Sequence, residues 1–409
     1  MRYPIPTSRD EAVELDRQDP LRDRRSQFVL EEGLIYLDGH SLGPAGQLAL
    51  QSLDKTAQTA WSRGLIRSWN EAGWIDWPMA LGDKIARLIG VCPGEVIVTD
   101  TVSVNLFKLA AAALPLAKSR VLIVERDEFP TDQYILEGLR RLSGVEMIRT
   151  EAGKGAARLA ETGGVLIKSA VNYKTAAIAD IHSLEKTAHG SDGLIIWDLS
   201  HATGLLALDL TGSGARLAVG CTYKYLNGGP GAPAFVYAAN AICDDLVSPL
   251  SGWMGHANPF AFDSQYVPQK GVARFACGTP PILSMAGLKG TLEAFDGVDL
   301  NQLAEKAQVL GDLCLSFGEE FGLNTVSPRI GAPRGGHVSL VHEEGYAIVQ
   351  ALIARNIIAD FRAPDLMRFG VSPLYVRFQD VWDAMTSLGD ILRTEAWNTP
   401  VFRTRAKVT

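Results

Sequence analysis

Residues 194–231 read LIIWDLSHATGLLALDLTGSGARLAVGCTYKYLNGGPG, and this stretch decides the expected fold. It holds two short apolar runs, 194–198 and 217–221, with the length and composition of buried strands. Asp198 closes the first run, and Lys224 follows the second. Because the carboxyl ends of parallel strands line the ligand crevice of an open α/β sheet, we expect Asp198 and Lys224 to share one edge of such a sheet.

Apolar strands and helices alternate on both sides of this stretch. We expect further strands at 96–99, 120–124 and 165–169, and helices at 103–113, 132–142 and 181–189. Parallel strands need crossover connections, so the alternation predicts an α/β fold with a mostly parallel sheet flanked by helices.

The pattern changes near residue 290 to that of a smaller α+β unit. The expected helices and strands there are 301–321, 337–341, 346–355, two strands around Phe361 and Phe369, and 381–396. The predicted domains are an N-terminal segment packing with the small domain (1–50), a large domain (51–290) and a small C-terminal domain (291–409).

Composition excludes several classes of protein. The 409 residues carry a formal net charge of −7 and no sustained basic patch, which argues against nucleic acid as a partner. No apolar stretch is long enough to span a membrane, and the charged N-terminus lacks a signal-peptide core. The five cysteines show no CxxC spacing, which favours a reduced, cytoplasmic protein without a metal site.

An Asp and a Lys at neighbouring strand ends, flanked by His201 and Tyr223, suit pyridoxal phosphate (PLP). A Lys amine forms a Schiff base with the aldehyde, and an Asp keeps the pyridine nitrogen protonated. Taken alone, the Asp could equally be a helix cap and the Tyr-Lys pair a surface feature.

Two further segments fit the same cofactor. Residues 99–105 (TDTVSVN) begin a helix with hydroxyls and free N–H groups, which suits a phosphate but also an ordinary N-cap. Phe129, just after a strand, could stack on a planar ring or be a plain core residue.

Six motifs, in order and spacing, resemble kynureninase, a fold-type-I PLP enzyme of the class V aminotransferase superfamily. The motifs are LDGHSLGP (37–44), FPTD (129–132), DLSHATG (198–204), CTYKYLN (221–227), GWMGH (252–256) and GTPP (278–281). No single motif is decisive, but the ordered set covers nearly the whole chain. His40 departs from the family, in which many members have Asn at this position.

The resemblance implies that Lys224, Tyr223 and Asp198 are catalytic. It implies that Lys224 holds PLP, that Asp198 pairs with the pyridine nitrogen and that Phe129 stacks on the ring. The other implied cofactor residues are Val102, Ser103, Asp132, Ser169, His201, Tyr223, Trp253 and Thr279. In the family's homodimer, Trp253 and Thr279 would reach the site from the other subunit.

On the substrate side, Arg368 matches the arginine that binds the α-carboxylate, with His40 and His256 close by. A guanidinium suits this task because it grips a carboxylate with two parallel hydrogen bonds. The Trp-rich stretch Trp61, Trp69, Trp74 and Trp77 could line an apolar pocket for the aryl ring, or could be a core or interface patch.

The implied activity is hydrolysis of L-kynurenine, and possibly of 3-hydroxykynurenine, to the corresponding anthranilate and L-alanine. It would place the chain in tryptophan catabolism and NAD biosynthesis.

Three alternatives compete with this reading. A cysteine desulfurase or aminotransferase shares the Asp and Lys framework, but a desulfurase needs a mobile C-terminal Cys, and no Cys follows Cys314. A Rossmann dehydrogenase is disfavoured because NGGPG (227–231) does not match GxGxxG. A silent relative should have lost Lys224 or Asp198, and both are present.

Overall fold

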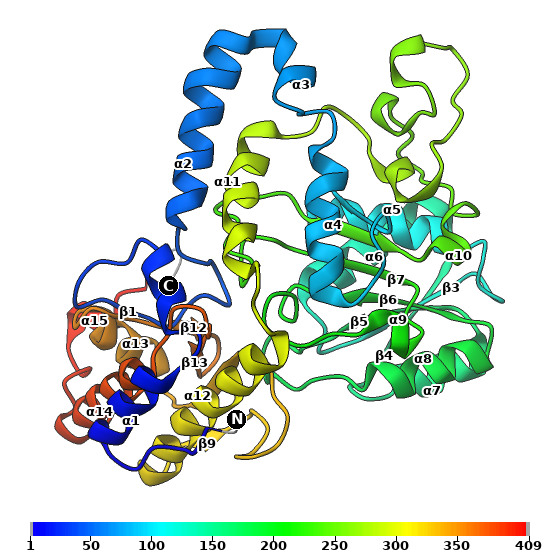
Figure 1. Cartoon of the computed structure of the whole chain (residues 1–409). Helices are drawn as coiled ribbons and strands as arrows, with labels where there is room; N and C mark the ends of the chain where they lie inside the picture. The colour runs from blue at the N-terminus through cyan, green and yellow to red at the C-terminus, as the bar shows by residue number, and fades with distance from the viewer. Residues whose placement is uncertain (1–2, 406–409) are drawn as a thin grey trace.

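A seven-stranded sheet forms the centre of the computed structural model, which describes residues 3–405 (Figure 1). The strand order is β2-β8-β7-β6-β5-β3-β4, and only β2 and β8 pair antiparallel with their neighbours. The strands are β2 (Val96–Val98), β3 (Val121–Glu125), β4 (Glu146–Thr150), β5 (Val165–Ser169), β6 (Leu194–Asp198), β7 (Leu217–Gly220) and β8 (Phe235–Ala238). The predicted mostly parallel α/β sheet is therefore confirmed.

Both faces of this sheet are buried, which explains the continuous apolar runs. In β6, Leu194 and Ile196 belong to the core shared with α5 (Val102–Ala113) and α6 (Pro130–Ser143). The alternate residues Ile195 and Trp197 face the opposite core, built with α4 (Trp77–Ile89), α7 (Gly155–Thr162), α8 (Ile181–Gly190) and α11 (Ile282–Leu292). In a strand that is buried on both faces, residues pointing to either side are apolar, so the sequence does not alternate between polar and apolar residues.

Local chemistry sets where the helices at the sheet's carboxyl edge begin. The Thr101 hydroxyl accepts from the N–H of Val104 and caps α5. Pro130 occupies the first turn of α6, where a missing N–H costs nothing. As a result, Phe129 precedes α6 and Asp132 lies in its first turn.

The C-terminal unit is an antiparallel sheet packed with three long helices. The sheet order is β12 (Asp360–Arg362), β13 (Leu366–Gly370), β10 (His337–Val341) and β9 (Asn324–Thr325). The helices are α12 (Leu300–Glu320), α13 (Gly345–Ile353) and α14 (Phe378–Thr394).

The N-terminal segment joins the C-terminal unit. In this segment β1 (Ile35–Tyr36) pairs in parallel with β11 (Ile357–Ile358), and α1 (Arg9–Gln18) packs on α14 (Figure 1).

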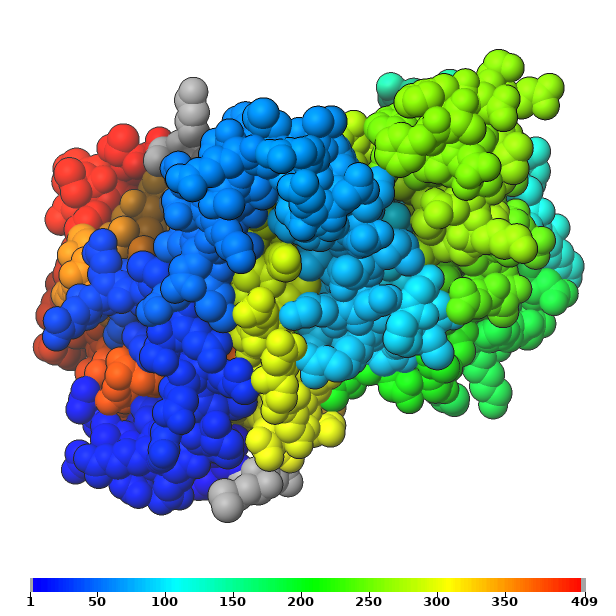
Figure 2. Space-filling view, turned by 45° about the horizontal axis from the view of Figure 1, so that its top comes forward, coloured from blue at the N-terminus to red at the C-terminus, as the bar shows by residue number. Residues whose placement is uncertain are grey.

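An arch of helices stands above α11. It rises through α2 (Gln47–Lys55) and η2 (Thr56–Gly64) and returns through η3 (Leu65–Arg67) and α3 (Ser68–Glu71) to α4 (Figure 1). Figure 2 shows the arch in blue at the top of the molecule, beside the light-green loops that follow β8. The remaining short elements are η1 (Arg22–Gln27), α9 (Leu210–Ser213), α10 (Asn240–Cys243), η4 (Trp253–Gly255), η5 (Pro259–Ala261), η6 (Gly271–Phe275), η7 (Glu293–Phe295) and α15 (Pro400–Arg403).

Sequence patterns missed β4, β8, α4, α7, α11 and the arch. β4 is polar and only half-buried, and β8 is short and lies among turn residues, so neither shows a clear strand pattern. The helix α11 is apolar all round because it is enclosed between α2 and α4. Among residues 3–405, no helix combines the length and the hydropathy that crossing a bilayer requires.

A buried ion pair ties the N-terminal segment to the C-terminal unit. Lys306 Nζ lies 2.7 Å from Asp19 Oδ2 and donates to the Pro373 carbonyl at 2.7 Å. Asp19 also accepts from the Tyr3 hydroxyl at 3.0 Å. Both charged side chains are 2% exposed.

We therefore expect Lys306→Met to lower the free energy of unfolding by about 3 kcal/mol, because it leaves Asp19 buried without its cation. Urea unfolding measures the change, and Lys186→Met on the exposed face of α8 is the control. A loss no larger than that of the control would show that the pair does not hold the segments together.

Candidate active site

Three neighbouring parallel strands end at one edge of the sheet. In register, Ser169 at the end of β5 lies beside Asp198 at the end of β6, and Asp198 lies beside Val219 of β7. The turn that follows β7 carries Lys224. The two residues that the sequence placed at strand ends therefore come to the same edge.

Lys224 is enclosed by rings. Its Nζ lies 2.9 Å from His201 Nε2, and 6.0 Å from the ring centroids of both Phe129 and Tyr223. Asp198 is buried, and its Oδ1 accepts from the N–H of Ser200 at 2.8 Å. The Lys224 amine therefore lies beside the ring of Phe129, a residue that is 40% exposed, at the sheet edge where Asp198 ends its strand.

Asp132 is buried close to Asp198 and Lys224, and neither of its carboxylate oxygens has a hydrogen-bond partner. Burial, and then the charges of Asp198 and Glu128, raise the pKa of Asp132 well above its usual range. His201 Nδ1 is likewise buried without a partner. Unpaired buried polar atoms of this kind are costly, so they indicate a site shaped for a polar occupant. These residues fit PLP.

A charged scaffold lies behind Asp132. Lys168 Nζ is 2.6 Å from Glu125 and 2.7 Å from Glu128, and Glu128 also accepts from the N–H of Ser169. Lys168 therefore bridges two carboxylates and fixes the ends of β3 and β5 against each other.

The segment 37–44 locks the Lys224 turn. The N–H of Gly43 donates to the Tyr223 carbonyl at 2.8 Å, and the N–H of Asn227 donates to the Lys224 carbonyl at 2.8 Å. A Cβ on Gly43 would lie 2.2 Å from Asn227 Oδ1 and 2.4 Å from the Lys224 carbonyl. Only glycine can lie this close to the backbone that carries Lys224.

Arg368 lies on β13 of the C-terminal unit and faces the same region. Its Nε donates to Asp360 at 3.1 Å, and its Nη1 donates to the Tyr173 carbonyl at 2.7 Å. The Tyr173 ring in turn contacts Phe129, with centroids 5.1 Å apart. Through Tyr173, the guanidinium is thus connected to the cluster around Lys224.

Three buried imidazoles lie between Arg368 and Lys224. His40 stacks on His337 at 5.1 Å, and His201 lies 5.6 Å from His337. Burial lowers the pKa of all three, that of His40 to about 3, so each ring is neutral at pH 7.

Three of the remaining predicted cofactor residues, Val102, Ser103 and Tyr223, lie at the same edge of the sheet as Lys224, whereas Trp253 and Thr279 lie in the loops beyond β8. Val102 and Ser103 lie in the first turn of α5, where N–H groups are free of helical partners. The pKa of Tyr223 is raised by the neighbouring Cys221, by burial and by Asp198.

Trp253, His256 and Thr279 lie elsewhere within the chain, in the loops beyond β8. Trp253 packs on Phe260, and His256 contacts Tyr266. Among the residues described, none of the hydrogen bonds or ring contacts of these three side chains reaches Lys224.

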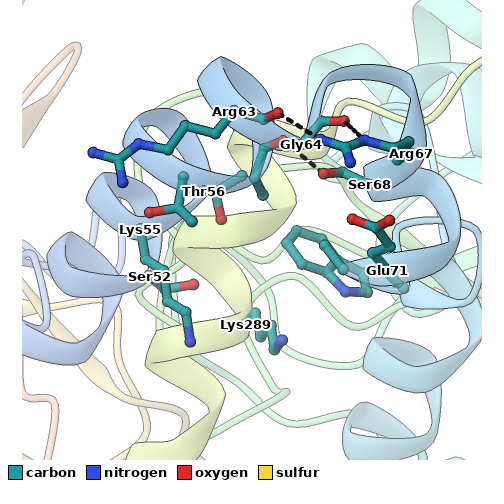
Figure 3. Close-up of a pocket in the computed structure, with 13 residues that line it drawn as sticks. Ser52, Lys55, Thr56, Arg63, Gly64, Arg67, Ser68, Glu71 and Lys289 are labelled. Carbon is teal, nitrogen blue, oxygen red and sulfur yellow. Dashed lines mark hydrogen bonds between the residues drawn. The ribbon is translucent and has the colours of Figure 1, made fainter.

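The four tryptophans do not share one pocket. Trp61 and Trp74 line a cavity of about 330 Å³ with residues 280–284, directly after Thr279. Trp77 faces a different cavity of about 480 Å³ under the arch, where Lys289 lies 4.8 Å from its ring (Figure 3). The cations of that cavity, Lys55, Arg63, Arg67 and Lys289, belong to none of the predicted sites.

Sequence reasoning missed His337, Asp360, Glu128 and Tyr173. His337 follows two glycines at the start of a predicted strand, which was the only available signal. Asp360 lies next to Arg368 only because β12 and β13 pair antiparallel, with Asp360 opposite Arg368. That register cannot be read from spacing.

The close approach of Gly43 to the Lys224 turn predicts that a larger residue at position 43 weakens cofactor binding. We expect Gly43→Ala to weaken PLP affinity about tenfold, because the added methyl displaces the Lys224 turn. The dissociation constant is measured by titrating apoprotein with PLP and following the visible absorbance band. Gly138→Ala is the control, since no atom lies within 4 Å of its Cβ position. Equal affinities for both variants would contradict the expectation.

Solved structures with the same fold are PLP enzymes. A variant of C-DES with glycine covalently linked to its PLP cofactor matches with a TM-score of 0.78 and 16% identity over 90% of this chain and 99% of that one. A cysteine desulfurase from Thermococcus onnurineus matches at 0.77, with 17% identity over 91% and 98%. An aspartate aminotransferase from Thermus thermophilus matches at 0.66, with 18% identity over 87% and 99%. These similarities establish the fold.

Sequence comparison identifies the family. A profile described as "Kynureninase C-terminal domain" matches residues 303–388. A kynureninase of Burkholderia pseudomallei is 46% identical over 98% of this chain and 100% of its own length. A kynureninase of Pseudomonas fluorescens is 44% identical over the same shares. The chain belongs to the kynureninase family.

Proposed function

We propose that this protein is a PLP-dependent hydrolase that converts L-kynurenine to anthranilate and L-alanine. The observation that carries the proposal is the joint placement of Lys224, Asp198 and Arg368. Asp198 ends β6, and Lys224 lies in the turn that follows the neighbouring strand β7. Arg368 donates to the carbonyl of Tyr173, whose ring contacts Phe129 beside Lys224. The identity of about 45% with named kynureninases supports the same activity.

Each residue has a physical task. Lys224 would hold the cofactor through its amine and would move a proton at the substrate's α-carbon. Asp198 holds a proton on the pyridine nitrogen, and Phe129 packs on the ring face. When bound, PLP supplies an electron sink next to the α-carbon.

Arg368 binds the α-carboxylate, and Tyr223 is the acid–base group near the ketone. The neighbouring Cys221, burial and Asp198 raise the pKa of Tyr223, so its hydroxyl stays protonated at pH 7 and can donate a hydrogen bond to the carbonyl oxygen. Val102, Ser103, Asp132, Ser169 and His201 complete the cofactor site.

We further propose that the enzyme is a homodimer with sites at the interface. Trp253 is 40% exposed and Trp61 is 57% exposed, and Thr279 is also exposed. Exposed large aromatic side chains are typical of protein interfaces. The cavity between Trp61, Trp74 and residues 280–284 is largely apolar and would receive the aryl ring at the neighbouring subunit's site. His256 lines a separate cavity together with Trp253.

A desulfurase activity does not fit the cysteines. Cys314 is fully buried in α12, and burial raises the pKa of its thiol to about 12. Such a thiol is not a nucleophile at neutral pH.

All five cysteines are free, which supports a reducing, cytoplasmic location. The activity would place the enzyme in tryptophan catabolism, upstream of NAD biosynthesis.

The activity is tested by incubating the PLP-loaded protein with L-kynurenine and recording anthranilate fluorescence. We expect turnover by the wild type and loss of at least about 10³-fold in Lys224→Ala, which removes the covalent anchor. Lys186→Ala, on an exposed face of α8, is the matched control. The same assay with 3-hydroxykynurenine measures the preference between the two substrates.

Absence of anthranilate over hours, from protein that shows the yellow PLP band, would reject this function. Release of sulfide from cysteine, or amino-group transfer to a keto acid, would then favour the alternative enzymes.

Shared sites predict complementation between two inactive subunits. Lys224→Ala and Trp253→Ala chains, each nearly inactive alone, should regain about a quarter of wild-type activity when unfolded and refolded together. Half of the dimers would then be mixed, and each mixed dimer would have one native site of two. If Trp253 acted within its own chain, the mixture would gain no activity.

A further inference from the structure

A line of four polar side chains runs behind the substrate-binding face of Arg368. Asp38 Oδ1 lies 3.5 Å from His40 Nδ1, and His40 Nε2 lies 3.6 Å from Asp360 Oδ2. Asp360 Oδ2 accepts from Arg368 Nε at 3.1 Å and also contacts Nη2. The imidazole therefore lies between two carboxylates, of which one holds the guanidinium.

His40 cannot approach a substrate directly. It is fully buried, stacked on His337 with an interplanar angle of 13°. On another side it lies against Gly370, where a Cβ would come within 2.2 Å of Nδ1. Packing thus fixes the ring plane, so that its two nitrogens face Asp38 and Asp360 and nothing else within the described contacts.

We propose that His40 is a positioning residue that, with Asp38, orients Asp360 and thereby sets the affinity of Arg368 for the carboxylate of the amino-acid substrate. The inference rests on the proposed function, and it gives a role to the residue in which this chain departs from the family's Asn. A neutral imidazole with its proton on Nε2 points that proton toward Asp360 and its Nδ1 lone pair toward a protonated Asp38, across contacts of 3.6 and 3.5 Å that a small shift would turn into hydrogen bonds.

The contacts along Asp38, His40, Asp360 and Arg368 are expected to change with pH because Asp38 changes its charge. Burial, and then the charge of Asp360, raise the pKa of Asp38 to about 7. Below pH 7 the protonated carboxyl donates to Nδ1, which keeps the His40 proton on Nε2. Above pH 7 the ionised Asp38 carboxylate competes with Asp360 for the single imidazole proton, so Asp360 is left without its donor part of the time. The added negative charge near Arg368 also weakens binding of an anionic substrate.

The other groups around the line keep their charge between pH 6 and 8. Contacts with His40 and Arg368 outweigh burial and lower the pKa of Asp360. His201 and His337 remain neutral, and the raised pKa of nearby Tyr36, Tyr225 and Tyr375 keeps them protonated. Arg362 and Arg368 are the neighbouring cations, and Lys224 would be held by the cofactor in the loaded enzyme. Asp38 is therefore the group expected to titrate.

Two isosteric variants separate the two contacts of His40. The amide nitrogen of Asn occupies the position of Nδ1 and cannot reach Asp360. The amide nitrogen of Gln occupies the position of Nε2 and can donate to Asp360. We expect His40→Asn to raise KM for L-kynurenine about tenfold with little change in kcat, and His40→Gln to recover most of that loss. His182→Asn, exposed on α8, is the control.

Product inhibition supplies a readout that a general loss of structure would not give. L-Alanine carries the α-carboxylate, whereas anthranilate does not. The inhibition constant of L-alanine should rise about tenfold in His40→Asn, while that of anthranilate stays within about twofold of wild type. A parallel rise in both constants would overturn the proposal, since it would indicate a distorted site.

The pH dependence is the second readout. In the wild type the L-alanine inhibition constant should increase across pH 6 to 8 with a midpoint near 7, and this increase should vanish in Asp38→Asn. An unchanged pH profile in Asp38→Asn, or an unchanged KM in His40→Asn, would overturn the role of the line. A wild type without any turnover of L-kynurenine would instead reject the proposed function.

Discussion

The parallel pairing of β5, β6 and β7 is the constraint on which the site depends. Hydrogen bonds between these strands fix their register, so that Ser169, Asp198 and the turn carrying Lys224 end at one edge. Burial of both sheet faces holds that register, because a slip by one residue would turn polar strand ends into the core. Lys224 and Asp198 are therefore placed by backbone geometry, and side-chain contacts such as that of Lys224 with His201 refine their positions.

Charge is distributed unevenly around this edge. Behind it, Lys168 bridges Glu125 and Glu128, and Asp360 holds Arg368. Within it, Asp132 and His201 have buried polar atoms that no protein group satisfies. Leaving such atoms unpaired costs stability, and a bound polar cofactor removes that cost. The contrast between satisfied scaffold and unsatisfied site is what a preorganised binding site requires.

The segment 37–44 connects the two structural units. Gly43 contacts the Lys224 turn, while His40 and Ser41 contact Asp360 of the C-terminal sheet. One short loop thus touches both the cofactor anchor and the residue that holds Arg368.

The sequence by itself determined the fold class, the strands that carry the site, and the family, because apolar runs and ordered motifs are local patterns that residue chemistry dictates. It also indicated Asp198, Lys224 and Arg368. Only the tertiary structure decided that Asp360 faces Arg368, that His40 stacks on His337, and that Trp61 and Trp74 line a different cavity from Trp77. These are contacts between residues distant in the chain, set by antiparallel register and by packing of the arch, and no local spacing encodes them.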